Sequence, residues 1–129
     1  MLKNTKAFSS FSTSDVTKAK EFYDTTLGIE TSDMMGGIQL HFAGENKTFI
    51  YPKPDHVPAT FTVLNFLVAD IDKAVDELTQ KGVTFEHYDQ DQMKTDEKVI
   101  ARGDGVNGPS IAWFKDPAGN FLSIIEDKN

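Results

Sequence analysis

Three histidines are the side chains best suited to acid–base chemistry or metal binding, and none has a second ligand at metal-binding spacing. His41 falls in the strand-like run "IQLHF", His56 in the proline-rich "YPKPDHVPA" and His87 in "FEHYD". Metal sites built from one element usually carry two ligands a few residues apart. We therefore expect surface or partly buried imidazoles, and keep only His41 as a pocket candidate, because a strand can point it inward and imidazole titrates near neutrality.

Tyr51 and Arg102 complete the set of candidate catalytic residues. A phenol can act as an acid, and a guanidinium can stabilise an anion. Arg102 lies in the Gly-rich stretch "KVIARGDGVNGP", where an ion pair with a neighbouring acid is the alternative and more common role. The sequence has no cysteine, which excludes disulfides and thiolate metal ligands.

Composition excludes several classes of partner. Twenty acidic and 13 basic residues give a net charge of −7, which disfavours binding to nucleic acid. No stretch is apolar for long enough to span a membrane. The opening "MLKNTKAFSSFSTSD" lacks the unbroken apolar run of a signal peptide, so we expect a cytoplasmic protein.

The chain contains one pattern twice. "STSDVTKAKEFYDTTLGIE" (12–30) aligns with "LVADIDKAVDELTQKGVTF" (67–85) when residue n is set against n+55, with a slip of one residue before the glycine. Each copy reads as a strand, then a helix capped by Asp15 (or Ser14) or Asp70, then a glycine stop at Gly28 or Gly82. The second helix is predicted to be one residue shorter.

Short β-like runs surround the two helices. The predicted strands are "KAFSSFST" (6–13), "IQLHF" (38–42), "KTFIY" (47–51), "TFTVLNFLV" (60–68), "VTFEHY" (83–88), "KVIAR" (98–102), "SIAWF" (110–114) and "FLSII" (121–125). "DPAGN" (116–120) predicts a tight turn in which Asp116 can accept backbone hydrogen bonds and Gly119-Asn120 tolerate positive φ. The charged stretch 89–109 is predicted to be a solvated connection, or alternatively a mobile loop at the mouth of the site.

These features resemble the vicinal oxygen chelate superfamily, which includes glyoxalase I, extradiol dioxygenases and bleomycin resistance proteins. The resemblance rests on the repeat, on "SDVTKAKEFYDTTLG" and on the closing "WFKDPAGNFLSIIE", and it covers essentially the whole chain. It implies an α+β fold of two tandem βαβββ units, whose curled mixed sheets surround a cleft with the helices outside. It also implies one domain over 1–129, with units at about 1–52 and 59–129, and a homodimer.

The resemblance also implies where a metal would lie, with two ligands from each unit. The first ligand is usually a His on the opening strand, seven residues before the helix-capping Asp, which gives Phe8 and Val63 here. The second ligand of the last unit is usually a Glu four residues after the glycine of DPxGN, which gives Ser123. Its counterpart in the first unit is placed at Tyr51. These side chains lack the imidazole and carboxylate donors of such sites, so we expect no metal and no other cofactor.

Strand alternation extends the candidate ligand-binding set, because residues two apart share a face. The set comprises Phe8, Ser10, Tyr51, Val63, Asn65, Trp113 and Ser123, with Ser12, Leu67, Phe121 and Ile125 on the same faces. Its mixture of apolar, hydroxyl and amide groups predicts a metal-free protein that binds a small molecule. Three alternatives stay open: a lyase, isomerase or dioxygenase-type enzyme, an ordinary packed core, and a domain that only mediates association.

Overall fold

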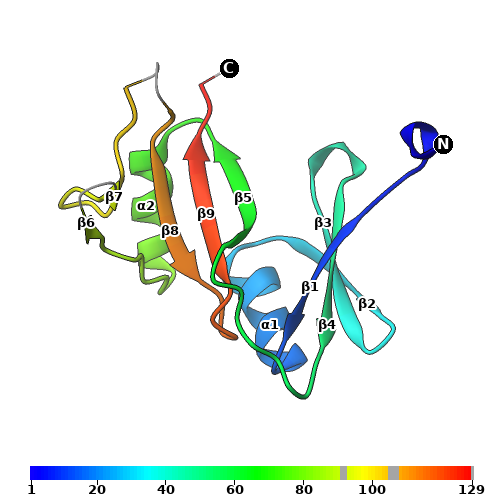
Figure 1. Ribbon diagram of the computed structural model, residues 1–129. Helices are drawn as coiled ribbons and strands as arrows, with labels where there is room; N and C mark the ends of the chain where they lie inside the picture. Colours follow the sequence, from blue (N-terminus) through cyan, green and yellow to red (C-terminus); the bar gives the residue numbers. More distant parts are fainter. Residues whose placement is uncertain (91–92, 105–107, 129) are drawn as a thin grey trace. The chain divides into compact units, whose positions relative to one another are not determined.

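In the computed structural model of the chain, which describes residues 1–90, 93–104 and 108–128, the polypeptide forms two units, Met1–Pro58 and Ala59–Asn129 (Figure 1). The first unit runs β1 (Ser9–Thr13), α1 (Val16–Lys20), η2 (Glu21–Thr26), β2 (Glu30–Met34), β3 (Gly37–His41) and β4 (Lys47–Pro52), with short turns η1 (Leu2–Asn4) and η3 (Ala43–Glu45). The second runs β5 (Thr62–Val68), α2 (Ile71–Gln80), β6 (Asp89–Gln90), β7 (Met93–Lys94), β8 (Ile111–Lys115) and β9 (Phe121–Glu126).

The two sheets share one topology, as the sequence repeat predicts. The first unit has the strand order β1-β4-β3-β2, and the second has β5-β9-β8. In both, the opening strand pairs in parallel with the closing strand, and the remaining pairs are antiparallel. The place of β2 is taken in the second unit by a single bridge between Phe85 and Phe114. The α+β prediction with two βαβββ units is therefore confirmed.

Aspartate caps start both helices, also as predicted. Lys18 donates its backbone N–H to Asp15 Oδ1 at 3.0 Å, and Lys73 donates to Asp70 Oδ1 at 3.1 Å. Each bond satisfies one of the amides that a helix N-terminus leaves without an intrahelical acceptor.

The extra residue of the first helix is absorbed by a π-helical segment. After α1 the chain continues as η2, and Leu27 donates its N–H to the carbonyl of Phe22, five residues back, at 2.9 Å. A π-type turn holds one residue more than an α-turn, which explains the one-residue slip between the two repeats. The shorter second helix is confirmed, and α2 is regular throughout.

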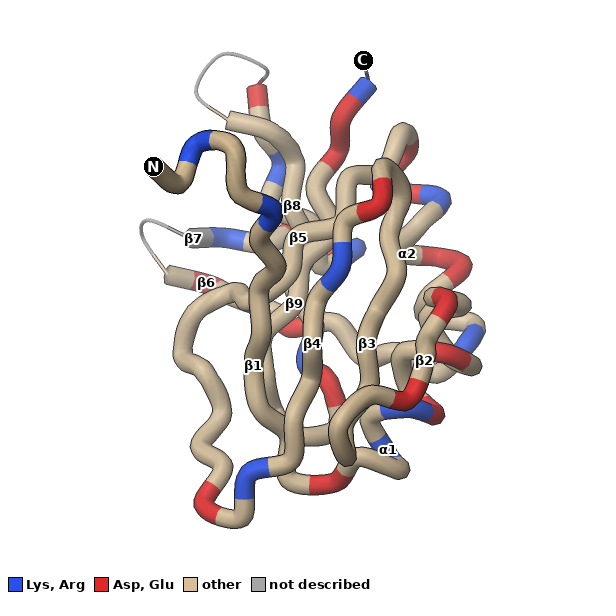
Figure 2. The backbone as a smooth tube through the Cα atoms, turned by 90° about the vertical axis from the view of Figure 1, so that its right-hand side faces the viewer, with Lys and Arg blue, Asp and Glu red and all other residues tan. Residues whose placement is uncertain are grey.

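Each sheet buries its large apolar side chains on the face beneath its helix. In the first unit Ile38, Leu40 and Ile50 are fully buried on the same side as Phe11, whose ring lies 6.3 Å from that of Tyr23 in η2. In the second unit the corresponding buried residues are Ile71, Val75, Ala112, Phe114, Leu122 and Ile124. Charged residues lie mostly on the helices, β2 and the loops, while β1 and β3 carry none (Figure 2).

The "DPAGN" turn joins β8 to β9 around a buried aspartate. Asp116 Oδ1 accepts the N–H groups of Ala118 at 3.0 Å and Asn120 at 2.9 Å. Asn120 donates its side-chain amide to Asp116 Oδ2 at 3.1 Å. Gly119 has φ 85°, whereas the φ of Asn120 is not positive.

Several predicted boundaries were wrong. Strand β2 was missed because "ETSDM" has no apolar alternation, and its pairing with β3 supplies the stability instead. "VTFEHY" and "KVIAR" form only single bridges to Phe114 and Ile111. The predicted connection 89–109 contains the small β6–β7 pair, while its residues 91–92 and 105–107 lie outside the described part of the chain.

Gly37 in β3 provides the first test of this packing. A Cβ at this position would lie 2.1 Å from the Ile50 carbonyl oxygen and 3.1 Å from the Phe49 ring, so backbone would have to move. We expect Gly37→Ala to lower the free energy of unfolding by about 1–3 kcal/mol in urea denaturation. Gly108→Ala is the control, since a Cβ there meets no atom within 4 Å and φ is not positive. Equal stability of the two variants would contradict the close approach of β3 and β4.

Candidate functional site

The face of the first sheet away from α1 carries most of the side chains that could bind a ligand. Residues directly opposite each other on paired strands point to the same side. Ser12 lies beside Tyr51, Ser10 beside Phe49, and Gln39 also beside Phe49. We call this surface the unit 1 face; it comprises Ser10, Ser12, Gln39, His41, Lys47, Phe49 and Tyr51.

Aromatic rings and anchored imidazoles dominate the unit 1 face. The rings of Phe49 and Tyr51 lie 6.1 Å apart with an interplanar angle of 32°. His41 Nε2 is 2.8 Å from the Ser32 hydroxyl, and His56 Nδ1 is 2.7 Å from the Ser12 hydroxyl. The proline-rich connection therefore turns back toward the sheet and brings His56 to β1, which its sequence position did not indicate.

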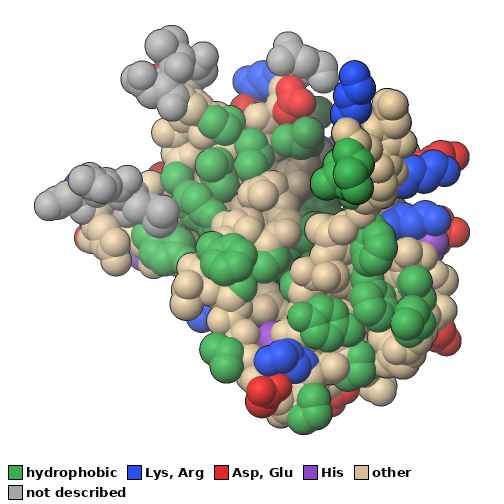
Figure 3. All heavy atoms as spheres, turned by 45° about the vertical axis from the view of Figure 1, so that its right-hand side comes forward, with side chains coloured by type: hydrophobic (Ala, Val, Ile, Leu, Met, Phe, Trp, Pro, Cys, Tyr) green, Lys and Arg blue, Asp and Glu red, His purple; other side chains and the backbone are tan. Residues whose placement is uncertain are grey.

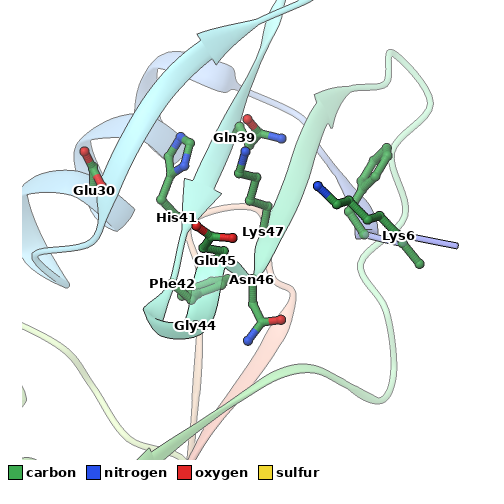
Figure 4. Close-up of a pocket in the computed structure, with 11 residues that line it drawn as sticks. Lys6, Glu30, Gln39, His41, Phe42, Gly44, Glu45, Asn46 and Lys47 are labelled. Atoms are coloured by element: carbon green, nitrogen blue, oxygen red, sulfur yellow. The ribbon is translucent and has the colours of Figure 1, made fainter. Parts of the chain in front are cut away.

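One end of the unit 1 face opens into a hollow of about 1040 Å³ (Figure 4). The hollow lies over the ends of β1, β3 and β4 and includes the turn η3. Its lining combines Phe8 and Phe42 with five charged or titratable side chains: Lys6, Glu30, His41, Glu45 and Lys47. Phe8, just before β1, leaves 61% of its surface exposed.

The second sheet also has a face turned away from its helix, which we call the unit 2 face; it comprises Asn65, Leu67, Trp113, Phe121, Ser123 and Ile125. Asn65 and Trp113 are the cross-strand neighbours of Ser123 on either side. Ser123 is fully buried and donates its hydroxyl to Asn65 Oδ1 at 2.6 Å. Trp113 packs edge-to-face on Tyr88 at 5.7 Å, and burial raises the pKa of Tyr88, with the nearby Glu86 adding to the effect.

Large apolar side chains remain exposed in both units. Met35 in the first unit is 84% exposed, and Leu67, on the unit 2 face, is 67% exposed. Hydrophobic side chains reach the surface between polar ones in the space-filling view (Figure 3). Apolar side chains scattered singly in this way are common on protein surfaces and do not by themselves mark a binding site.

The structure corrects the placement of one expected metal position. Ser123 pairs with Asn65, which the repeat aligns with Ser10, and Ser10 pairs with Phe49. Phe49 is therefore the counterpart of Ser123, and Tyr51 lies two residues further along β4. The placement of this position at Tyr51 was therefore wrong by two residues, although Tyr51 shares the face of Phe49.

The four positions do not fit a divalent metal. Phe8, Phe49 and Val63 offer no nitrogen or oxygen donor, and the Ser123 hydroxyl is already used by Asn65. Val63 also lies where the register between β5 and β9 shifts. Among the described residues, no three His, Asp or Glu side chains are grouped so that they could hold a metal ion.

Arg102 lies on the helix side of the second unit, in an ion network. Its guanidinium donates two hydrogen bonds to Asp72 of α2, at 2.9 and 2.8 Å, and one to Asp96 at 2.7 Å. The hydrogen bond with Arg102 holds the pKa of Asp72 well below its usual value, and hydrogen bonds to both acids raise the pKa of Arg102. An ion pair with neighbouring acids, the alternative role predicted for Arg102, therefore describes this residue better than a catalytic role.

The same network anchors part of the predicted connection. Lys98 pairs with Asp72 at 3.4 Å and Asp76 at 3.3 Å on α2. Thr95 is buried, and its hydroxyl lies 2.8 Å from His87 Nδ1. The described residues from Thr95 to Arg102 are therefore held by specific polar contacts, which favours neither a mobile loop nor a fully solvated one.

Strand alternation brought the correct neighbours together in both units. Ser10, Ser12 and Tyr51 share one face, and Asn65, Trp113 and Ser123 share the other. Phe49 and Lys47 were missed although the same alternation, counted back from Tyr51, would have found them. Lys6 was also missed, although it opens the predicted strand 6–13 and alternates with Phe8 and Ser10. Glu30 and His56 lie outside the predicted strands, and no periodic signal pointed to them.

Two βαβββ units, each with a helix on one side of its sheet, are typical of a glyoxalase-type fold. A profile of the Glyoxalase/Bleomycin resistance protein/Dioxygenase superfamily matches residues 9–124. The chain belongs to this superfamily. A search of curated proteins gave no match.

Solved structures agree on the fold. The antibiotic binding protein TnmS3 from Streptomyces sp. CB03234 is similar at 21% identity and a TM-score of 0.63, covering 94% of this chain and 95% of that one. Lactoylglutathione lyase from Agrobacterium tumefaciens is similar at 19% identity and a TM-score of 0.63, and the match covers 96% of this chain and 95% of that one. A member of the superfamily from Sphaerobacter thermophilus DSM 20745 is similar at 23% identity and a TM-score of 0.69, and the match covers 96% of this chain and 99% of that one.

Removing either partner of the Ser123–Asn65 hydrogen bond should reduce stability by a different amount. Asn65→Leu leaves a buried hydroxyl without its acceptor and should lower the free energy of unfolding by about 1–3 kcal/mol. Ser123→Ala should cost less, because the exposed Asn65 amide can bond to water instead. Urea denaturation of both single variants and the double variant measures the difference. A larger loss for Ser123→Ala than for Asn65→Leu would contradict the assignment.

The Arg102 network predicts a change in titration. Because the Asp72 pKa is lowered in the folded state, its contribution to stability exists above the unfolded-state pKa and is lost as pH falls through the folded one. Arg102→Met should raise the Asp72 pKa, observed by carboxyl-carbon NMR, and reduce stability more at pH 6 than at pH 2. Lys20→Met, which breaks the pair with Asp33 in the other unit, is the control and should leave Asp72 unchanged.

Proposed function

We propose that the protein is a metal-free member of the superfamily that binds a small, partly apolar molecule against its open sheet faces. The observation that carries the proposal is the donor chemistry of the four expected metal positions. Phenylalanine stands at two of them, valine at a third, and the serine at the fourth has its hydroxyl occupied by Asn65 at 2.6 Å.

The composition of the two faces supports a binding role. The unit 1 face pairs the rings of Phe49 and Tyr51 with serine hydroxyls, and the unit 2 face sets Trp113 beside the Asn65 amide. Small-molecule sites commonly combine an apolar, aromatic lining with a few fixed polar groups. TnmS3, which shares the fold, is described as an antibiotic binding protein, so a purely binding role has a precedent on this scaffold.

A metal-free acid–base enzyme is the second candidate, and the two histidines of the first unit favour it. His41 and His56 each form a short hydrogen bond to a serine hydroxyl, which fixes the orientation of the ring. An oriented imidazole beside an open face could move a proton of a bound molecule. The lyase described from Agrobacterium tumefaciens indicates that the scaffold also serves enzymes.

Two expectations from the resemblance complete the proposal. One is a single domain in which both units act together, and the other is a homodimer. Light scattering coupled to size-exclusion chromatography measures the mass directly. A mass of about one chain of 14.3 kDa in dilute solution would contradict the homodimer.

The metal-free prediction is tested by adding Ni²⁺, Zn²⁺, Mn²⁺ and Fe²⁺ separately and following thermal unfolding. Ligands that bind only the folded state raise the melting temperature, so we expect no metal-dependent shift. Elemental analysis of the purified protein should find no stoichiometric metal. A stoichiometric metal with a raised melting temperature would replace this proposal with a metalloenzyme.

Ligand binding is tested with small aromatic molecules through the fluorescence of Trp113, the only tryptophan. Saturable quenching that Ser123→Val weakens would support the proposal. Incubated ligand is then analysed by NMR for conversion. We expect unchanged ligand; product that disappears in His41→Asn would instead support the enzyme.

A further inference from the structure

We propose that the unit 1 face selects a planar aromatic molecule that carries one carboxylate, with Lys6 and Lys47 as the anion-binding pair. The inference rests on the proposed small-molecule binding and specifies its chemical class. The argument uses residues of the first unit alone. It joins two neighbouring features: the hollow beside η3 and the aromatic rings of β4.

The two lysines converge on the same space. Lys6, from the segment before β1, extends toward Lys47, from the start of β4, and the Lys47 ammonium lies beside the Gln39 side chain (Figure 4). In the described part of the chain, neither ammonium takes part in an ion pair. Two like charges directed at one hollow repel each other, and an anion placed between them removes that repulsion.

The aromatic part of the ligand would lie next to this pair. Lys47, Phe49 and Tyr51 alternate along β4, so all three side chains emerge from the unit 1 face. The distance from Lys47 to Tyr51 along the strand is about 13 Å at about 3.3 Å per residue. A bicyclic aromatic acid fits this span, with its rings against Phe49 and Tyr51 and its acid group at the lysines.

The acidic residues of the hollow limit the ligand to one negative group. Glu30 and Glu45 lie on the side of His41, away from Lys6 (Figure 4). A second anionic group reaching toward them would meet like charge, which is unfavourable. The site should therefore prefer a monocarboxylate to a phosphate ester or another polyanion.

The test compares 2-naphthoate with its neutral analogue 2-naphthamide by equilibrium dialysis at low salt. We expect naphthoate to bind about fivefold more tightly, as two exposed ammonium groups allow. Lys6→Gln with Lys47→Gln should remove this preference and leave naphthamide binding unchanged. Lys18→Gln, on α1 at the helix side of the sheet, is the matched control and should keep the preference. Circular dichroism verifies that each variant is folded.

The outcomes separate this inference from the proposed function. Equal binding of the two compounds, or a naphthoate preference that survives the double lysine substitution, would overturn the anion pair while small-molecule binding stands. Tighter binding of 2-naphthyl phosphate than of naphthoate would overturn the restriction to one negative charge. If neither naphthoate nor naphthamide binds, the inference and the aromatic-ligand proposal both fail.

Discussion

The parallel pairing of the opening strand with the closing strand is the constraint on which each unit depends. β1 is the first strand of its unit and pairs with β4, the last, and β5 pairs in the same way with β9. Parallel neighbours need a crossover, and the helix that follows the opening strand supplies it. The crossover places the helix over one face of the sheet, and the helix does not cover the other face.

The position of the helix over one face explains why the two faces of each sheet carry different types of side chain. Isoleucine, leucine and phenylalanine gather under the helix, where Ile50, Phe114 and Leu122 are fully buried. Serines, aromatic rings and amides alternate with them on the opposite face. Parallel pairing also brings Ser10 to Phe49 and Asn65 to Ser123, joining residues from opposite ends of each unit. A site built at this seam depends on long-range pairing more than on any local motif.

The same pairing places an aromatic ring and a bonded hydroxyl at equivalent points of the two sheets. Phe49 lies beside Ser10 in the first unit, and Ser123 donates its hydroxyl to Asn65 in the second. These two side chains offer apolar contact and a single hydrogen bond, and neither is an imidazole or a carboxylate. Charge that could act on a ligand is concentrated instead at the end of the first sheet, where Lys6 and Lys47 face one hollow.

The sequence by itself determined the features that local chemistry controls. Asp15 and Asp70 caps, the "DPAGN" turn, the repeat and the strand faces all follow from short-range rules of hydrogen bonding and alternation, and they were predicted correctly. The one-residue offset between repeats was visible too, although its π-helical cause was not. Tertiary structure alone decided the rest. Polar β2 forms because β3 lies beside it, His56 reaches Ser12 because the prolines turn the chain back, and Phe49 rather than Tyr51 matches Ser123 because pairing register is a long-range property.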